Sequence, residues 1–187
     1  MAGKLYGVGV GPGDPQLMTL KAVKCIEECS IIGIPAENTD TCTAWKIAAE
    51  AVPDMADREV LSVYIPMTKD YSVIEAAYDE GSARIRQKLD EGSNIAFLNL
   101  GDPTLYGTYM GIHKRIADMG YEARIIPGVT SVCAVAARLG ISLGGRGENI
   151  HILPGSYCLD EFSRLSGSKI IMKPAGEADY LIKTLAD

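Results

Sequence analysis

The sequence predicts an α/β protein of two domains with mostly parallel sheets. Short apolar runs, typical of buried strands, alternate along the chain with amphipathic stretches of helical periodicity. Three of these runs lead directly into glycine-bearing segments, GVGPGD, GDPTLYG and PGVTS. The alternation starts afresh after PGVTS, so we expect one α/β domain over residues 1–126 and a second over residues 127–187.

The first strand and helix have clear local signals. The run KLYGVGV at residues 4–10 predicts a strand. Asp14 is a good N-cap and Pro15 suits the first position of a helix, so we expect a helix over residues 15–28.

The rest of the first domain follows the same rhythm. Apolar runs predict further strands at residues 30–34, 59–65, 94–100 and 123–126. Helical spacing of apolar residues predicts helices at residues 42–51, 72–91 and 108–119.

The second domain has fewer elements. Strands are expected at residues 149–153 and 169–172. Helices are expected at residues 130–139, 158–165 and 177–185.

Composition restricts the function classes. With 187 residues, 47% of them apolar and 22% charged, the chain can bury a core without disulfides or metals. No apolar run approaches the ~20 residues of a membrane span, and the start lacks a signal peptide's apolar stretch, so we expect a cytoplasmic protein. A net charge of -6 without a basic stripe argues against a general nucleic-acid surface.

The cysteines do not predict a metal site or a disulfide framework. The chain has five cysteines, an odd number, and none forms a CxxC pair. Cys25 and Cys29 are four residues apart, so we expect them to pack on one face of a helix as reduced thiols.

The three glycine-bearing motifs follow strands, and the carboxyl edge of a parallel sheet is where ligands bind. Each motif alone has a plainer explanation. Pro103 excludes Asp102 from the helical region, as a tight turn requires, and PGVTS can equally be a helix start capped by Thr130 or Ser131.

Common phosphate-binding loops fit the first motif poorly. It lacks the GK[ST] of a P-loop. Pro12 and Pro15 stand where a dinucleotide-binding loop would donate N–H groups, and no acidic residue ends the second strand. A dinucleotide-dependent oxidoreductase, which should bind NADH, therefore remains a weaker alternative.

Taken in order, GVGPGDPxxMTLKA, LGDPTLYGTY and IIPGVTS resemble the tetrapyrrole methylases, the methyltransferases of corrin and sirohaem synthesis. The resemblance implies two α/β domains with S-adenosylmethionine (SAM) in the cleft between them, S-adenosylhomocysteine as product, a tetrapyrrole substrate and a homodimer. A comparison of SAM and NADH binding would separate this family from the oxidoreductase alternative. The family pattern continues beyond residue 187, so the resemblance also implies that the second domain is incomplete in this sequence.

Two further segments resemble one branch of that family. FLNLGDPTLYGTYMGIHKRI and YIPMTKDY look most like the enzymes that methylate C20 of precorrin-2 or of its cobalt complex, cobalt-factor II. Methylation at C11, at C17 or of uroporphyrinogen III remains the alternative within the family.

The matching motifs imply site residues. The cofactor contacts carried over from the family are Val10, Gly101, Asp102, Leu105, Tyr106, Thr130, Ser131 and Met172. The residues implied to face the tetrapyrrole are Pro12, Gly13, Asp14, Tyr109 and Met110.

The sequence assigns no catalytic side chain. Methyl transfer from a sulfonium depends mainly on alignment of the reactants, and no Ser/His/Asp or Cys/His constellation is visible. His113 could take up a proton, although a surface or capping role is the simpler reading, and His151 is expected to be a hydrogen-bonded core residue. A noncatalytic tetrapyrrole or cobalt carrier would need ligands at fixed spacing, which the cysteines and histidines do not provide.

A negatively charged protein needs local cations to hold a substrate with many carboxylates. The candidates are Lys114, Arg115, Arg138 and Arg146, the last within the glycine-rich segment LGGRGEN.

Overall fold

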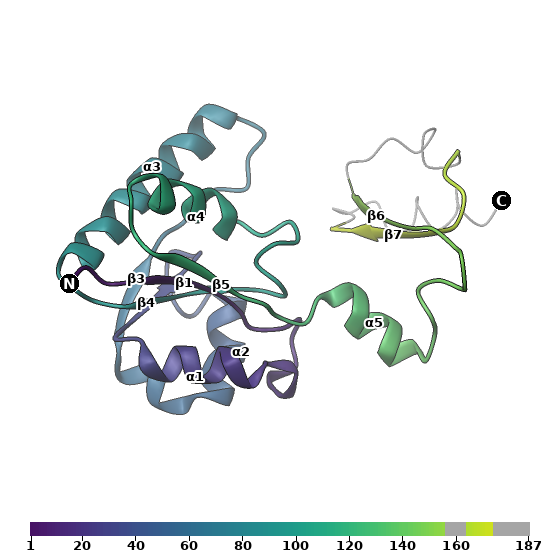
Figure 1. The fold of residues 1–187 in the computed structure, drawn as a ribbon, viewed down its shortest axis with the longest axis horizontal. Coiled ribbons are helices and arrows are strands. Elements are labelled where there is room, and N and C mark those ends of the chain that lie inside the picture. Colours follow the sequence, from purple (N-terminus) through teal and green to yellow (C-terminus); the bar gives the residue numbers. More distant parts are fainter. Residues whose placement is uncertain (156–163, 174–187) are drawn as a thin grey trace. The chain divides into compact units, whose positions relative to one another are not determined.

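The computed structural model describes residues 1–155 and 164–173 of the chain (Figure 1). The chain divides into two compact units, Met1–Ser131 and Val132–Asp187. The division falls in the first turn of helix α5 (Ser131–Leu139), and the functional domain limits at residues 126 and 127 remain a prediction.

A five-stranded sheet forms the centre of the first unit, with the order β3-β2-β4-β1-β5 and every neighbouring pair parallel. The strands are β1 (Leu5–Gly9), β2 (Ile31–Ile34), β3 (Glu59–Ser62), β4 (Ile95–Asn99) and β5 (Ala123–Ile126). The predicted parallel α/β architecture is confirmed. Each strand of the sheet therefore ends at the same edge.

Helices cover both faces of this sheet (Figure 1). One face carries α1 (Leu20–Glu28) and α2 (Thr43–Ala51), and the other carries α3 (Tyr71–Asp90) and α4 (Tyr109–Asp118). Neighbouring residues of a strand point to opposite faces, so Leu98 packs in the core under α1 and α2 while Phe97 packs in the core under α3 and α4.

The helix expected over residues 15–28 is wrong as a single element. Asp14 does act as a cap, accepting a hydrogen bond from the Gln16 nitrogen at 2.8 Å, but the turn it starts is a 3-10 helix that ends at Leu17. Thr19 then caps α1, because its hydroxyl accepts from the Ala22 nitrogen at 3.1 Å. Two good caps lie in one segment, and the second one starts the α-helix.

The second unit contains α5 and a parallel pair of strands, β6 (Ile150–Pro154) and β7 (Ser168–Met172). Both strands were expected within a residue at each end. The Nε2 of His151 on β6 lies 3.0 Å from the Ser166 carbonyl oxygen, so its predicted hydrogen bond is present. The prediction that His151 is a core residue is wrong, because the residue is only half-buried. The helix predicted at residues 177–185, and that predicted at 158–165 up to residue 163, lie outside the described residues.

Cys25 and Cys29 are buried in the core beneath α1, where both were expected to pack. Cys29 stands just past the last helical residue as the C-cap, so it packs from the helix end rather than from the helix itself. In residues 1–155 and 164–173 no cluster of three or more metal-ligating side chains occurs. Over the same residues, none of the helices combines the length and apolar character that a membrane span requires.

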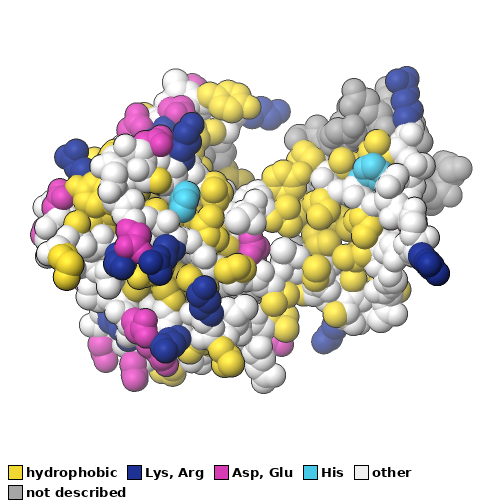
Figure 2. Space-filling model, viewed as in Figure 1, with side chains coloured by type: hydrophobic (Ala, Val, Ile, Leu, Met, Phe, Trp, Pro, Cys, Tyr) yellow, Lys and Arg dark blue, Asp and Glu magenta, His cyan; other side chains and the backbone are white. Residues whose placement is uncertain are grey.

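The surface of the first unit carries charges of both signs. On the face drawn in Figure 2, basic and acidic side chains are interspersed over this unit. The unit also has partly exposed ion pairs, such as Lys4 with Glu122 at 2.9 Å and Lys88 with Glu59 at 2.9 Å. Ion pairs near the surface stabilise a fold little.

Candidate functional site

The three glycine-bearing motifs meet at one point of the first unit, at the carboxyl edge of its sheet. Gly9 ends β1, Gly101 follows β4, and Gly128 follows β5. A Cβ atom on Gly128 would lie 2.2 Å from the Gly101 carbonyl oxygen, and one on Gly9 would lie 2.6 Å from the Gly128 nitrogen. The three backbones therefore touch directly, and only glycine allows this approach.

Hydrogen bonds join the first two motifs. The Gly101 nitrogen donates to the Gly11 carbonyl oxygen at 2.8 Å, and the Gly11 nitrogen donates back at 3.4 Å, which makes an isolated antiparallel bridge. Just before this bridge, the buried Val10 donates to the Asn99 carbonyl oxygen at 3.0 Å. The predicted cofactor residues Val10 and Gly101 are thus neighbours in space.

Asp102 joins the second motif to the third. Its Oδ2 accepts from the Gly128 nitrogen at 2.9 Å, and its Oδ1 accepts from the Thr104 nitrogen at 2.8 Å and from the Thr104 hydroxyl. Burial raises the pKa of Asp102, but the hydrogen bonds from Thr104 and Gly128 outweigh burial and hold the pKa below its ordinary value. The carboxylate is therefore ionised at neutral pH.

Replacement of Asp102 by asparagine should destabilise the protein by about 1–2 kcal/mol, because an amide oxygen cannot accept from both partners and one donor loses its bond. The folded-state pKa of Asp102 is lowered, so its stabilisation is complete above the unfolded pKa near ~4 and is lost as pH falls through the folded pKa. Urea unfolding from pH 3 to pH 7 measures the free energy of unfolding of both proteins. The difference between the wild type and Asp102→Asn should shrink below about pH 4. An advantage that does not change with pH would contradict this role of Asp102.

The converging loops hold backbone conformations that favour glycine. Gly101 has a φ of 70°, and a Cβ there would meet only the Val129 carbonyl oxygen, at 4.0 Å. Gly13 has a φ of 153°, with nothing within 4 Å of such an atom. Tyr106 is a non-glycine residue at a φ of 51° and is exposed. Strained backbone beside open space is typical of a ligand-binding loop.

Most of the other predicted site residues lie on the same loops. Leu105 is half-buried and its nitrogen donates to the Asp102 carbonyl oxygen at 3.3 Å. Thr130 is half-buried directly after the third motif, and Ser131 is exposed at the start of α5. Met172 is half-buried at the end of β7 in the second unit, so the first unit by itself does not contain it.

Four of the five residues predicted to face the substrate are exposed or half-buried, and the fifth, Tyr109, is fully buried. Gly13 and Asp14 are exposed on the first loop, with Pro12 half-buried beside them, and Met110 is exposed on the first turn of α4.

The prediction for Tyr109 is wrong. Its side chain is fully buried against β1, where a Cβ on Gly7 would lie 2.0 Å from the Tyr109 ring. Burial raises the pKa of Tyr109. Its hydroxyl donates to the Arg124 carbonyl oxygen at 3.2 Å and lies 3.1 Å from the Nδ1 of the half-buried His113. Tyr109 is therefore a core residue, and it also orients His113.

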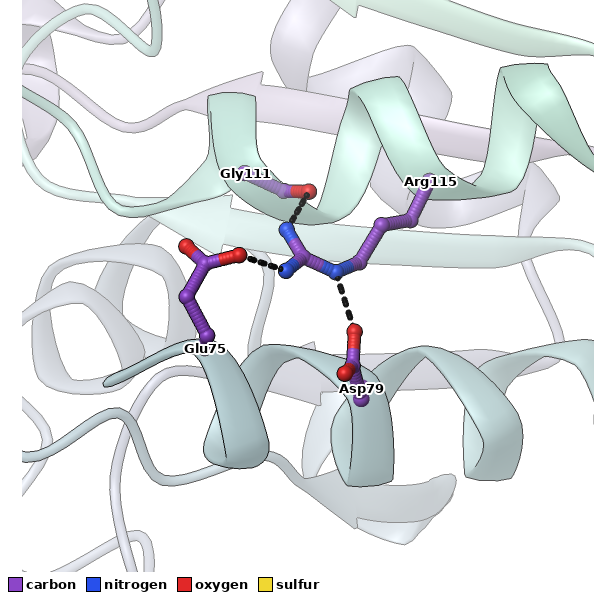
Figure 3. Close-up of polar contacts among 4 residues, drawn as sticks. All are labelled: Glu75, Asp79, Gly111 and Arg115. Atoms are coloured by element: carbon purple, nitrogen blue, oxygen red, sulfur yellow. Dashed lines mark hydrogen bonds and ion pairs between the residues drawn. The ribbon is translucent and has the colours of Figure 1, made fainter. Parts of the chain in front are cut away.

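Arg115 was a candidate to bind the carboxylates of the substrate, but its guanidinium is already paired with acidic side chains of the protein. Its Nη2 lies 2.6 Å from Glu75 Oε2 and its Nε lies 2.7 Å from Asp79 Oδ1, while Nη1 donates to the Gly111 carbonyl oxygen at 3.1 Å (Figure 3). The guanidinium also lies over the Tyr78 ring, 5.0 Å from its centre. Arg115 fastens α3 to α4, whereas Lys114, Arg138 and Arg146 are exposed.

The chain is similar in sequence to known proteins. The sequence profile of the family described as Tetrapyrrole (Corrin/Porphyrin) Methylases matches residues 4–187. A Methanocaldococcus jannaschii protein named "Probable cobalt-precorrin-2 C(20)-methyltransferase" is 33% identical over 91% of this chain and 72% of its own length. A Sinorhizobium protein named "Precorrin-2 C(20)-methyltransferase" is 28% identical over 98% of this chain and 78% of its own length.

The fold is also similar to that of a solved structure. The X-ray structure of the cobalamin biosynthetic enzyme cobalt precorrin-4 methyltransferase, CbiF, matches with a TM-score of 0.63 and 27% identity. The match covers 81% of this chain and 57% of the solved chain. The three ordered motifs, the convergent loops and the profile match agree, and the chain belongs to the tetrapyrrole (corrin/porphyrin) methylases.

Proposed function

We propose that this chain, a SAM-dependent methyltransferase of the tetrapyrrole methylase family, methylates C20 of precorrin-2 or of cobalt-factor II in cobalamin biosynthesis. The names of the Methanocaldococcus and Sinorhizobium relatives support this position on the ring. The chain spans about three quarters of those two relatives, so the activity of the whole protein is part of the proposal.

The observation that carries the proposal is the convergence of Gly9, Gly101 and Gly128. It brings three loops together at the sheet edge where parallel α/β proteins bind ligands. The Asp102 carboxylate fixes the third loop against the second, with Oδ2 on the Gly128 nitrogen. A site fixed in this way can align two reactants without a movement of its own.

The space beside the buried Gly101 suits a methyl donor. A side chain at Gly101 would project into open space, so this residue leaves room for a ligand against the loop. The proposed cofactor contacts on these loops of the first unit are Val10, Asp102, Leu105, Tyr106, Thr130 and Ser131. Met172, on β7 of the second unit, is proposed as a further contact from the family resemblance alone. Pro12, Gly13, Asp14 and Met110 are proposed to border the tetrapyrrole.

The chemistry needs few side chains. SAM supplies an activated methyl group, and as the ring carbon forms its new C–C bond the C–S bond breaks, S-adenosylhomocysteine leaves and C20 gives up a proton. The protein positions carbon, methyl and sulfur, and alignment of this kind lowers barriers by ~7–11 kcal/mol. His113 points its Nδ1 to the Tyr109 hydroxyl and is a structural residue in this scheme.

The homodimer that the family resemblance implies belongs to the same proposal, and so does the cytoplasmic location expected from the sequence. Methylation at C11, at C17 or of uroporphyrinogen III is the alternative within the family.

The decisive experiment uses SAM labelled with ¹³C in its methyl group. Incubation with precorrin-2, and separately with cobalt-factor II, should give a single labelled carbon, and NMR of the product should assign it to a methyl on C20. A label on another ring carbon would refute the C20 assignment. Transfer to neither tetrapyrrole, by a protein that binds S-adenosylhomocysteine, would refute the substrate class.

A further inference from the structure

A row of exposed apolar side chains follows β3 at the carboxyl edge of the first unit's sheet. The row lies in the segment of residues 64–73, which begins with the YIPMTKDY motif at residues 64–71. Its exposed fractions are high: Tyr64 50%, Met67 85%, Tyr71 80% and Val73 46%. Large side chains exposed together in this way commonly mark a binding surface.

Buried side chains hold the 64–73 segment against the core. Val63 and Ile65 are buried in the core under α3 and α4, and the Val63 nitrogen donates to the Ile34 carbonyl oxygen at 2.9 Å. Gly81 of α3 lies so close that a Cβ there would be 2.3 Å from Val63. Because Val63 and Ile65 point inward, Tyr64 between them points outward.

The end of the segment is fixed as well. The Asp70 carboxylate accepts from the Ser72 nitrogen at 2.9 Å and so caps α3. Tyr71 is the first residue of that helix and Glu75 lies one turn further on. The exposed row is therefore attached to a well-defined helix start.

Arg115 fixes this helix start relative to the second glycine motif. The ion pairs from Arg115 to Glu75 and Asp79 join the N-terminal half of α3 to α4 (Figure 3). Both helices follow strands of one parallel sheet on the same face, so both begin at the carboxyl edge. Tyr71 therefore lies at the end of α3 that is next to the GDPTLYG loop, from which α4 begins.

The distance across the sheet suits a broad ligand. β3 is separated from β4 by β2 alone, which corresponds to about 10 Å between the two strands at the usual spacing. A tetrapyrrole has a broad apolar macrocycle with carboxylates around its rim. A ligand of that width, held at the loop after β4, extends over neighbouring strand ends.

We propose that the 64–73 segment is a substrate-recognition surface, in which Met67 and Tyr71 contact the apolar face of the macrocycle and the exposed Lys69 meets a rim carboxylate. This inference rests on the proposed function, since it names the part of the chain that recognises the same substrate. Arg115 acts as a positioning residue through α3.

The test is the double variant Met67→Ser/Tyr71→Ser. Removal of the exposed apolar contacts should raise the KM for the tetrapyrrole about tenfold or more. The Kd for S-adenosylhomocysteine and the Tm should stay unchanged, because both side chains are exposed and lie outside the glycine loops. Tyr71→Phe keeps the ring and should retain the wild-type KM.

The matched control is Met119→Ser. Met119 is exposed to 44% and follows the last residue of α4, at the opposite end of that helix from the proposed surface, so its loss should leave the KM unchanged. An unchanged KM in the double variant, with methylation by the wild type intact, overturns the inference and leaves the proposed function standing. Absence of any tetrapyrrole turnover or binding by the wild type overturns both.

Discussion

Replacement of Gly128 by alanine is expected to lower the free energy of unfolding by about 3 kcal/mol, at the upper end of the usual cost of overpacking. The new Cβ would lie 2.2 Å from the Gly101 carbonyl oxygen and 2.8 Å from the Gly9 Cα. Both neighbours are backbone atoms that a rotamer change cannot move. The third loop must therefore shift, which also strains the hydrogen bond from the Gly128 nitrogen to Asp102.

Urea unfolding measures the loss of stability of Gly128→Ala. Titration with S-adenosylhomocysteine measures the effect of the shifted loop on binding, and we expect the cofactor affinity to fall by at least about tenfold. Gly145→Ala is the matched control, because its Cβ would meet only the Glu148 carboxylate oxygen, at 3.4 Å, at the end of a flexible side chain. If Gly128→Ala were as stable as Gly145→Ala, the result would contradict the close backbone contact of Gly9, Gly101 and Gly128.

Much of the first unit could be predicted from the sequence because its signals are local. Apolar runs ending in glycine or proline located all five strands, and the parallel rhythm predicted that the motif-bearing strands would end at one edge. The start of α1 was misplaced because Asp14 and Thr19 are both good caps, and the sequence does not rank two caps within one segment.

The misassigned site residues depend on contacts between distant segments. Tyr109 lies two residues after the GDPTLYG motif, yet it fills the space that Gly7 leaves on β1. A glycine inside a strand is a signal for such close approach, but it does not name its partner. Arg115 likewise has partners 36 and 40 residues away, and the acidic pair Glu75 and Asp79, four residues apart on one helix face, was the available sign.

The last prediction concerns cofactor binding at Gly101. Gly101→Leu should reduce the affinity for S-adenosylhomocysteine by about 100-fold or more, because a side chain there enters the open space against the loop where we propose that the cofactor lies. Leucine at a φ of 70° also strains the backbone, at a cost of about 1–2 kcal/mol. A loss of affinity must therefore be separated from a loss of stability.

Gly120→Leu provides that separation. Gly120 has a φ of 88° with nothing within 4 Å of a Cβ, and it follows the end of α4, whereas the site lies near the beginning of this helix. The two variants should therefore lose similar stability in thermal melting, while isothermal titration should show weakened binding for Gly101→Leu alone. Equal affinities in the two variants would mean that the open space beside Gly101 is not where the cofactor binds, and the three loops would then be a structural junction instead of a methyl-donor site.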